Sequence, residues 1–310
     1  MLKHYYYFFL IFFILSQVSF AQEIKVFKIS DFDLKGNVKT CTVIKDYGQE
    51  IFDFDKNGFL IKSTTQYNEF DKDIVIYKYE SGELIEKRME SYKESELDRT
   101  TSMVNFFEID TSSNKHITEK IVSFDKEFFE QQEYFFNDAG VLEKIISSHE
   151  NAVDEILIEN SEYKNESTET VFENGMIQKS VRKSIKKSKN GMQLSVELTK
   201  EFVDGDPNKA IEKVIDEDGK LLSEQVFMHS IKEKEFVLTE IREFRYDAEG
   251  IPTKMITKTG NTEAVKEFVF QFDDSESKNW VKKITTPDNT YVTRRIEYYP
   301  TQEVKEEKPD

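Results

Sequence analysis

Apolar and polar residues alternate in short runs along most of the chain, and turn-forming residues separate the runs. The clearest example covers residues 51–62, where an alternating run meets the turn Asp55-Lys56-Asn57-Gly58 and a second apolar run follows. Side chains two positions apart lie on one face of a strand, so each run has an apolar face and a charged face. Glycine supplies the positive φ of a tight turn, and an Asp or Asn ahead of it hydrogen-bonds the turn backbone. The pattern predicts a β-hairpin.

The same unit recurs along the chain, and a period of about 20–50 residues is typical of a repeat-built fold. Its turn glycines fall at positions 58, 82, 140, 175, 219 and 250, so the spacing is loose. The 58-residue gap fits two units, because residues 105–110 read as a strand that runs into the turn-forming residues 111–114. The seven copies cover residues 51–62, 77–84, 133–144, 171–177, 214–221, 244–251 and, without glycine, 270–283.

These hairpins predict an all-β fold class, a meander of repeated antiparallel hairpins that forms an extended or curled sheet. One hairpin cannot bury its aromatic face alone, so neighbouring hairpins must pair to share a core. Residues 83–98 and 208–218 are rich in Glu and Lys and offer helical alternatives, but helical spacing lasts for no more than about two turns there. We expect charged strand or connector in both. No linker divides the chain, so residues 22–300 are expected to form a single domain.

A known repeat family shares features of this pattern. Residues 246–250 (Tyr-Asp-Ala-Glu-Gly) and 272–273 (Phe-Asp), the latter ahead of 279–283 (Asn-Trp-Val-Lys-Lys), resemble the YD or RHS-type repeat of exported bacterial proteins. The resemblance extends as a degenerate pattern over most of residues 31–300. It implies a repeat-built bacterial protein that works outside the cytoplasm.

The first 21 residues have the pattern of a secretory signal. A short basic start containing Lys3 precedes the apolar and aromatic run 5–15, and Ser19-Phe20-Ala21 offers small residues where a signal peptidase needs them. A membrane anchor is the alternative, but a spanning helix needs about 20 apolar residues and this run has 11. We predict cleavage between Ala21 and Gln22, and a soluble product in the periplasm or outside the cell. The acidic, lysine-rich residues 301–310 are expected to form a frayed tail.

The net charge limits which partners the protein can bind, and the cysteine content limits what can stabilise its fold. Removing residues 1–21 takes away one Lys and changes the net charge from −17 to −18, and no basic stripe follows, so nucleic-acid binding is disfavoured. The single cysteine, Cys41, cannot form an internal disulfide. The mature protein must therefore be stabilised by its aromatic and aliphatic core.

The sharpest motif match is to a calcium-binding loop. Asp53, Asp55 and Asn57 occupy its first three ligand positions and Gly58 its invariant glycine, but Thr64 stands where a bidentate Glu is needed. Apolar strand-like runs, rather than helices, flank the segment. We interpret it as a hairpin turn, which favours Asp, Asn and Gly for its own backbone geometry.

Other candidate residues are isolated. His116, His149 and His229 have no metal-ligand spacing. Cys41 lies on an alternating segment, and we interpret it as a small apolar residue rather than as a nucleophile. We assign no catalytic, cofactor-binding or metal residues and expect no cofactor. The basic stretch 182–189 favours a solvated strand face and turn, with contact to an anionic glycan or partner as the alternative.

The sequence alone favours a non-enzymatic exported protein, an interaction or structural component of the cell envelope that binds an envelope protein or polysaccharide. The alternative is an envelope hydrolase whose carboxylates are brought together by the fold. A third possibility is a spacer without a dedicated ligand.

Overall fold

The computed structural model describes residues 24–45, 47–125, 127–150 and 152–300. Over these residues the chain forms one short 3₁₀ helix, η1, followed by a single antiparallel sheet of 20 strands in which each strand pairs with the next, so the topology is a meander. The elements are η1 (Ile29–Phe32), β1 (Val38–Lys45), β2 (Gly48–Phe54), β3 (Leu60–Gln66), β4 (Lys72–Glu80), β5 (Glu83–Lys93), β6 (Glu96–Asp110), β7 (His116–Ser123), β8 (Phe128–Phe136), β9 (Leu142–His149), β10 (Ala152–Tyr163), β11 (Glu166–Glu173), β12 (Met176–Lys187), β13 (Gln193–Val203), β14 (Asp206–Ile215), β15 (Leu221–Ser230), β16 (Glu235–Tyr246), β17 (Pro252–Thr259), β18 (Thr262–Phe272), β19 (Trp280–Thr286) and β20 (Thr290–Tyr298).

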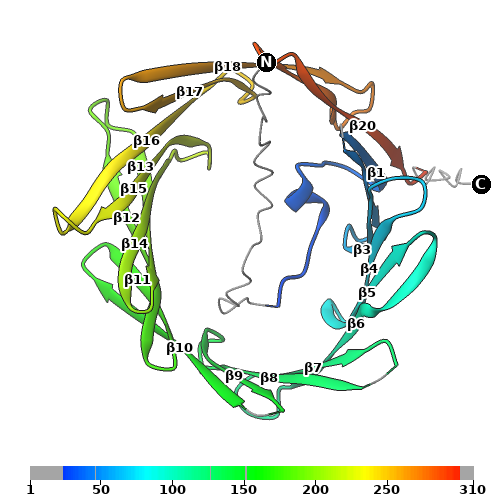
Figure 1. The fold of residues 1–310 in the computed structure, drawn as a ribbon. Coiled ribbons are helices and arrows are strands. Elements are labelled where there is room, and N and C mark those ends of the chain that lie inside the picture. Colours follow the sequence, from blue (N-terminus) through cyan, green and yellow to red (C-terminus); the bar gives the residue numbers. More distant parts are fainter. Residues whose placement is uncertain (1–23, 46, 126, 151, 301–310) are drawn as a thin grey trace, which may run out of the picture.

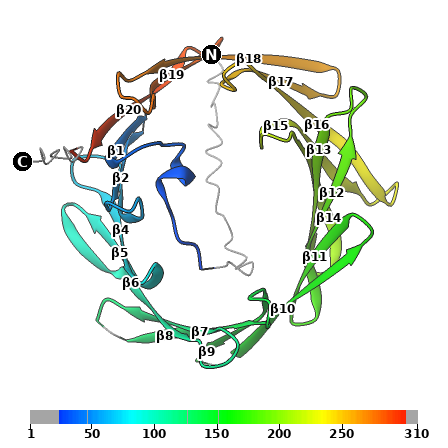
Figure 2. The same ribbon diagram turned by 180° about the vertical axis from the view of Figure 1, so that it is seen from behind.

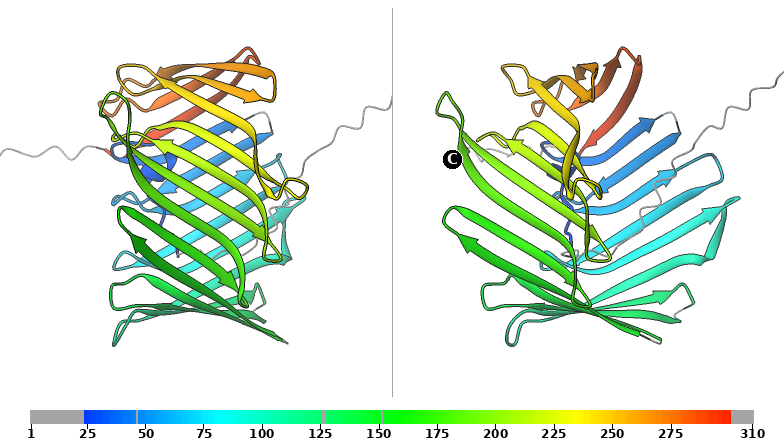
Figure 3. Two further views of the ribbon diagram at one scale, coloured as in Figure 1. Left: turned by 90° about the vertical axis from the view of Figure 1, so that its left-hand side faces the viewer. Right: turned by 60° about the vertical axis from the view of Figure 1, so that its left-hand side comes forward.

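The sheet closes on itself. Strand β1 pairs with β20 as well as with β2, and the register places Cys41 opposite Ile296 and Val43 opposite Arg294. Figures 1 and 2 show the resulting ring of strands, and Figure 3 shows that the strands run obliquely to its axis. The predicted antiparallel meander is confirmed, but the predicted extended or curled sheet is wrong. Closure satisfies the backbone groups that β1 and β20 would otherwise expose as free edges.

The predicted hairpins are adjacent, paired strands. All seven copies of the repeat form such pairs, residues 105–114 lead β6 into β7, and the charge-rich 83–98 and 208–218 contribute to β5, β6 and β14. In the first hairpin Gly58 has φ +82°, and Asp55 Oδ1 accepts hydrogen bonds from the amides of Asn57 and Phe59 at 2.9 and 2.8 Å. The same side-chain bonds recur at Asn137, Asp216 and Asp247. The repeated Asp or Asn therefore holds the turn.

Aromatic residues at the ends of strands connect neighbouring hairpins. A register shift separates Lys78 from Tyr79 and Arg245 from Tyr246, just before the turn in each case. The Tyr79 hydroxyl donates to the carbonyl oxygen of Leu60, and the Tyr246 hydroxyl donates to that of Leu221, each at 2.9 Å. Each acceptor begins the second strand of the preceding hairpin, so the repeat supplies bonds between units as well as within them.

Residues 24–37, which we call the inner segment, run along the inside of the barrel (Figures 1 and 2). Two clusters of buried side chains form where this segment packs on the wall. Ile24 and Val26 cover the first cluster, which is built from Leu84, Phe107, Ile117, Tyr134, Ile145, Ile156, Ile158 and Val171. Phe27, Ile29 and Phe32 pack against the second, which contains Leu34, Val38, Cys41, Val43, Phe54 and Leu60.

The described residues include no helix that is long and apolar enough to cross a membrane. The predicted signal, residues 1–21, and the predicted tail, residues 301–310, lie outside the residues that the structure describes.

Candidate functional site

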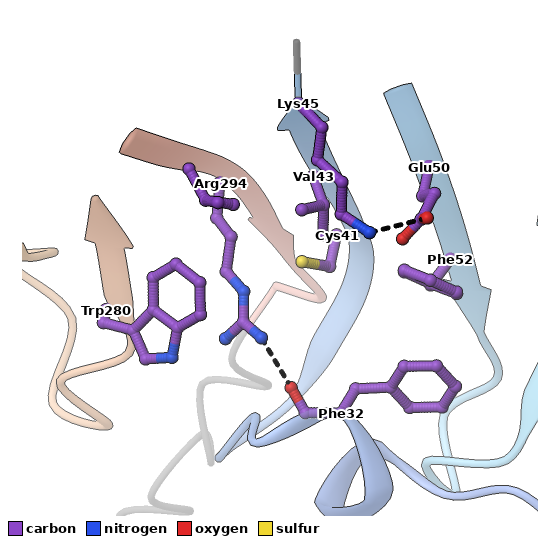
Figure 4. Close-up of a pocket in the computed structure, with 9 residues that line it drawn as sticks. Phe32, Cys41, Val43, Lys45, Glu50, Phe52, Trp280 and Arg294 are labelled. Atoms are coloured by element: carbon purple, nitrogen blue, oxygen red, sulfur yellow. Dashed lines mark hydrogen bonds and ion pairs between the residues drawn. The ribbon is translucent and has the colours of Figure 1, made fainter. Parts of the chain in front are cut away.

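A pocket of about 260 Å³ lies where the first and last strands close the barrel. Strands β1, β2, β19 and β20 contribute side chains, and Phe32 of the inner segment completes the wall. Figure 4 shows these side chains gathered around a common space. The pocket, which we call the seam pocket, is lined by Phe32, Cys41, Val43, Lys45, Glu50, Phe52, Trp280, Val292 and Arg294.

Strand alternation explains this composition. Cys41, Val43 and Lys45 are two positions apart on β1, and Val292 and Arg294 are two apart on β20, so each set lies on one face of its strand. This is the face that packs against the inner segment, because Cys41 and Val43 belong to the cluster that Phe32 covers. The seam pocket therefore opens on the inner face of the barrel.

Arg294 is the main cationic group of the pocket. Its Nη2 and Nη1 donate to the carbonyl oxygens of Phe32 and Asp33 at 2.9 and 3.2 Å, and its guanidinium carbon lies 3.5 Å from the centroid of the Trp280 ring. Trp280 Nε1 in turn donates to Asp33 Oδ2 at 2.7 Å. Figure 4 shows the Arg294 side chain between the indole and the Cys41 sulfur. Burial lowers the pKa of Arg294, and the planar guanidinium is held at both its edge and its face.

A second cation lies beside the pocket on the same face. Lys283 of β19 is opposite Val292 of β20, and its Nζ lies 4.4 Å from the centroid of the Phe268 ring and 5.7 Å from that of Phe270. Burial lowers the pKa of Lys283; the negative charge of Asp33 opposes this shift, and the positive charge of Arg294 adds to it. The two cations therefore repel each other across neighbouring strands.

The rim of the pocket contains a neutralised pair. Lys45 Nζ lies 2.7 Å from Glu50 Oε1, and the Tyr47 hydroxyl donates to the same oxygen at 2.7 Å. Hydrogen bonds from Lys45 and Tyr47 occupy this carboxylate. Glu50 is the one carboxylate among the residues that line the seam pocket.

Cys41 contributes an apolar surface rather than a nucleophile. Its side chain is 1% exposed, and burial raises the pKa of its thiol from 9.0 to about 11. A thiol with so high a pKa is protonated at neutral pH, whereas the thiolate is the reactive form. The interpretation of Cys41 as a small buried residue is consistent with this environment.

The structure keeps the other sequence candidates apart. Asp55 holds the turn, while Asp53 Oδ1 accepts a hydrogen bond from Thr40 Oγ1 at 2.9 Å, so the calcium-loop pattern serves a hairpin. The three histidines lie on β7, β9 and β15. Within the described part of the chain, no group of three or more His, Cys, Asp and Glu side chains is placed to hold a metal ion.

The basic stretch 182–189 is divided between the two faces of β12. Arg182 and Lys183 are adjacent on a strand and so point to opposite faces. Arg182 lies 3.8 Å from Glu166, and Lys183 lies 3.9 Å from Glu197. The stretch does not form one basic patch, which favours the solvated strand over an anion-binding surface.

The hydrolase alternative needs a carboxyl group with a raised pKa to act as a general acid. Among the described carboxyl groups, those whose pKa departs clearly from its usual value shift in the opposite direction. Hydrogen bonds from Lys78 and Arg88 outweigh burial and lower the pKa of Glu86, and Lys258 lowers that of Glu243. A second depression, of about 270 Å³ beside Glu155, Leu157, Glu159, Phe172 and Gly175, has two carboxylates but no cation among its lining residues.

Sequence reasoning missed the seam pocket. The sequence pattern places Trp280 in a repeat and gives Arg294 no role, because their partner Asp33 lies 247 and 261 residues away. The available signal was that Trp280 is the single tryptophan of a chain rich in Phe.

No family model matches the chain, and no curated protein matches it. Among solved structures, the chain is similar to a porin-like protein from Bacteroides vulgatus. The sequences are 7% identical, the alignment covers 85% of this chain and 99% of that one, and the TM-score is 0.24. A likeness at that score carries no argument about this protein. The barrel described above rests on its own strand pairing.

Proposed function

We propose that this protein is an exported, non-enzymatic binding protein of the cell envelope, and that the seam pocket takes part of an envelope protein or polysaccharide. The observation that carries the proposal is the composition of the pocket. Aromatic and aliphatic walls surround a fixed guanidinium, and such apolar cavities with a few well-placed polar groups are typical of ligand sites. The resemblance to YD or RHS-type repeats stays a proposal and adds to the case for export.

Charged side chains on the outer wall of the barrel favour a position in an aqueous compartment. Tyr77 packs its ring against Phe27 of the inner segment, so the neighbouring Lys78 points outward. Lys78 lies 2.6 Å from Glu86, and Glu86 lies 3.0 Å from Arg88. Lys78 is two residues from the end of β4, whereas Arg88 lies in the middle of β5. Charged groups on a lipid-facing wall cost about 2–4 kcal/mol each near the bilayer centre. A wall with such groups favours an aqueous part of the envelope.

The test is affinity capture from an envelope extract, with the purified mature protein as bait and the retained material analysed for protein and for sugar. We expect Trp280→Leu, which removes the support of Arg294, to reduce retention by about tenfold or more. The matched control is Tyr291→Leu, because Tyr291 lies on the next strand and is 57% exposed on the opposite face. Equal retention by Trp280→Leu would exclude the seam pocket as the binding site, and no specific retention by the unmodified protein would contradict a binding function.

A further inference from the structure

We propose that the seam pocket binds a small carboxylate carried on an apolar or ring-shaped body, with Arg294 and Lys283 as its counter-ions. This inference rests on the proposed binding function and adds the chemistry of the ligand. A free organic acid and an acidic sugar of a polysaccharide share this chemistry, and the experiment below distinguishes them.

The balance of charge on the inner face favours a bound anion. Arg294 donates to two carbonyl oxygens and lies on an indole, and Lys283 lies over two phenyl rings. Among the residues that the structure describes, neither cation has a carboxylate within ion-pair distance, and Asp33 is the acidic group whose charge reaches both. A desolvated cation without a counter-ion is costly. A carboxylate bound in the pocket would supply a counter-ion to Arg294 and would add negative charge to the face on which Lys283 lies.

Arg294 is preorganised to bind an anion. A guanidinium has five N–H donors, and here two of them are used by backbone carbonyls. Its Nε is buried and has no hydrogen-bond partner. The indole at 3.5 Å and the inner segment hold the group in one orientation, so binding an anion would cost little side-chain entropy.

The apolar walls of the pocket indicate the kind of molecule that carries the carboxylate. Phe32, Phe52, Val43 and Val292 give the pocket apolar walls, while the charge of Lys45 is already neutralised by Glu50. The volume of about 260 Å³ lies just below the range of about 300–1,000 Å³ for pockets that hold drug-sized ligands. The pocket therefore fits a small molecule, or the terminal residue of a longer one, with its anionic group at one end.

The experiment is isothermal titration calorimetry of the purified mature protein with glucuronate, glucose and benzoate. We expect at least one of the two carboxylates to bind at least about tenfold more tightly than neutral glucose, because a charge-assisted hydrogen bond contributes about 1.5–3 kcal/mol. Binding of glucuronate but not of benzoate would identify an acidic sugar as the source of the carboxylate. Binding of benzoate but not of glucuronate would identify a free organic acid. Glucose binding as tightly as the better carboxylate, or no binding by either carboxylate, would overturn the proposal.

Two adjacent lysines provide a matched pair of variants. Lys283 faces the pocket side of β19, whereas Lys282 points to the opposite face and lies over the exposed Tyr291 ring. We expect Lys283→Gln to weaken carboxylate binding about tenfold and Lys282→Gln to leave it unchanged. Equal weakening in both would contradict a specific counter-ion role. Arg294→Lys, checked for folding by circular dichroism, should also weaken binding because it removes the planar fork.

The two proposals fail separately. If an envelope partner is retained through Trp280 but no carboxylate binds, the ligand chemistry is wrong and the binding function stands. If glucuronate or benzoate binds at Lys283 and no envelope partner is retained, the site is correct and the macromolecular partner is wrong.

Discussion

The burial of Cys41 leads to a quantitative prediction about its chemical reactivity. Burial raises the pKa of this thiol from 9.0 to about 11. At pH 8 a thiol with the lower value is about 9% thiolate and one with the higher value about 0.1% thiolate, a ratio of about 90. Since the thiolate is the nucleophile, its smaller fraction alone should slow the reaction of native Cys41 by about 90-fold relative to the same residue in the unfolded chain. Its 1% exposure should slow the reaction further.

The assay is the rate of reaction with an aromatic disulfide reagent, followed by absorbance at pH 8, with and without denaturant. The control places a cysteine one residue further along β1, as Thr42→Cys in a Cys41→Ser background. Residues 41 and 42 point to opposite faces of the strand, and Thr42 is only half-buried. We expect this control to react much faster than native Cys41.

The dependence of the rate on pH provides a second readout. The native rate should keep rising about tenfold per pH unit beyond pH 9 and level off near the raised pKa of about 11. A native rate within about tenfold of the Thr42→Cys control, or a plateau near pH 9, would refute the argument that the inner segment and the inner face bury this thiol.

Three further predictions concern stability and processing. Phe54 is 1% exposed and packs against the Phe32 ring, so Phe54→Ala should lower the free energy of unfolding by about 3–5 kcal/mol, as measured by urea denaturation. The control Phe128→Ala, at a 56% exposed site, should lower it by about 0.5 kcal/mol or less. Burial lowers the pKa of Lys283, so its charged form destabilises the folded protein below that pKa. Lys283→Met should therefore raise the free energy of unfolding at pH 7, and the gain should vanish as the pH approaches the unfolded value of about 10.4. Lys282→Met, on the opposite face, should change the free energy of unfolding less. N-terminal sequencing of the exported protein should begin at Gln22, and an intact Met1 in the membrane fraction would contradict cleavage.

The hairpins could be predicted from sequence because their determinants are local. Asp55 and Gly58 are three residues apart, and the bonds that hold the turn connect groups within four residues of each other. The same chemistry repeats at Asn137, Asp216 and Asp247, so the pattern is visible without any knowledge of the fold. The order of the strands follows, because sequential hairpins pair with their neighbours.

Closure of the barrel and the seam pocket could not be predicted in the same way. The pairing of Val43 with Arg294 joins positions at opposite ends of the sheet, and neither strand differs in composition from its neighbours in a way that marks it as an edge. The pocket depends on that pairing and on Asp33, whose left-handed backbone (φ 54°) ends η1 beside Trp280. Such a site exists only after distant segments meet, so no spacing in the chain encodes it.

The pairing of the first strand with the last has a consequence for the order of assembly. The hairpins can form one after another from local contacts, but the ring cannot close until residues near position 290 are available, and contacts of such long range form slowly. The inner segment precedes β1 in the chain and lies inside the finished ring, where Arg294 of the final strand holds its backbone. The inner segment can dock early on the first hairpin, since Ile29 N donates to Gly58 O and Leu60 N donates to Phe27 O. Its bonds to Arg294, and with them the seam pocket, form only when the last strand closes the ring.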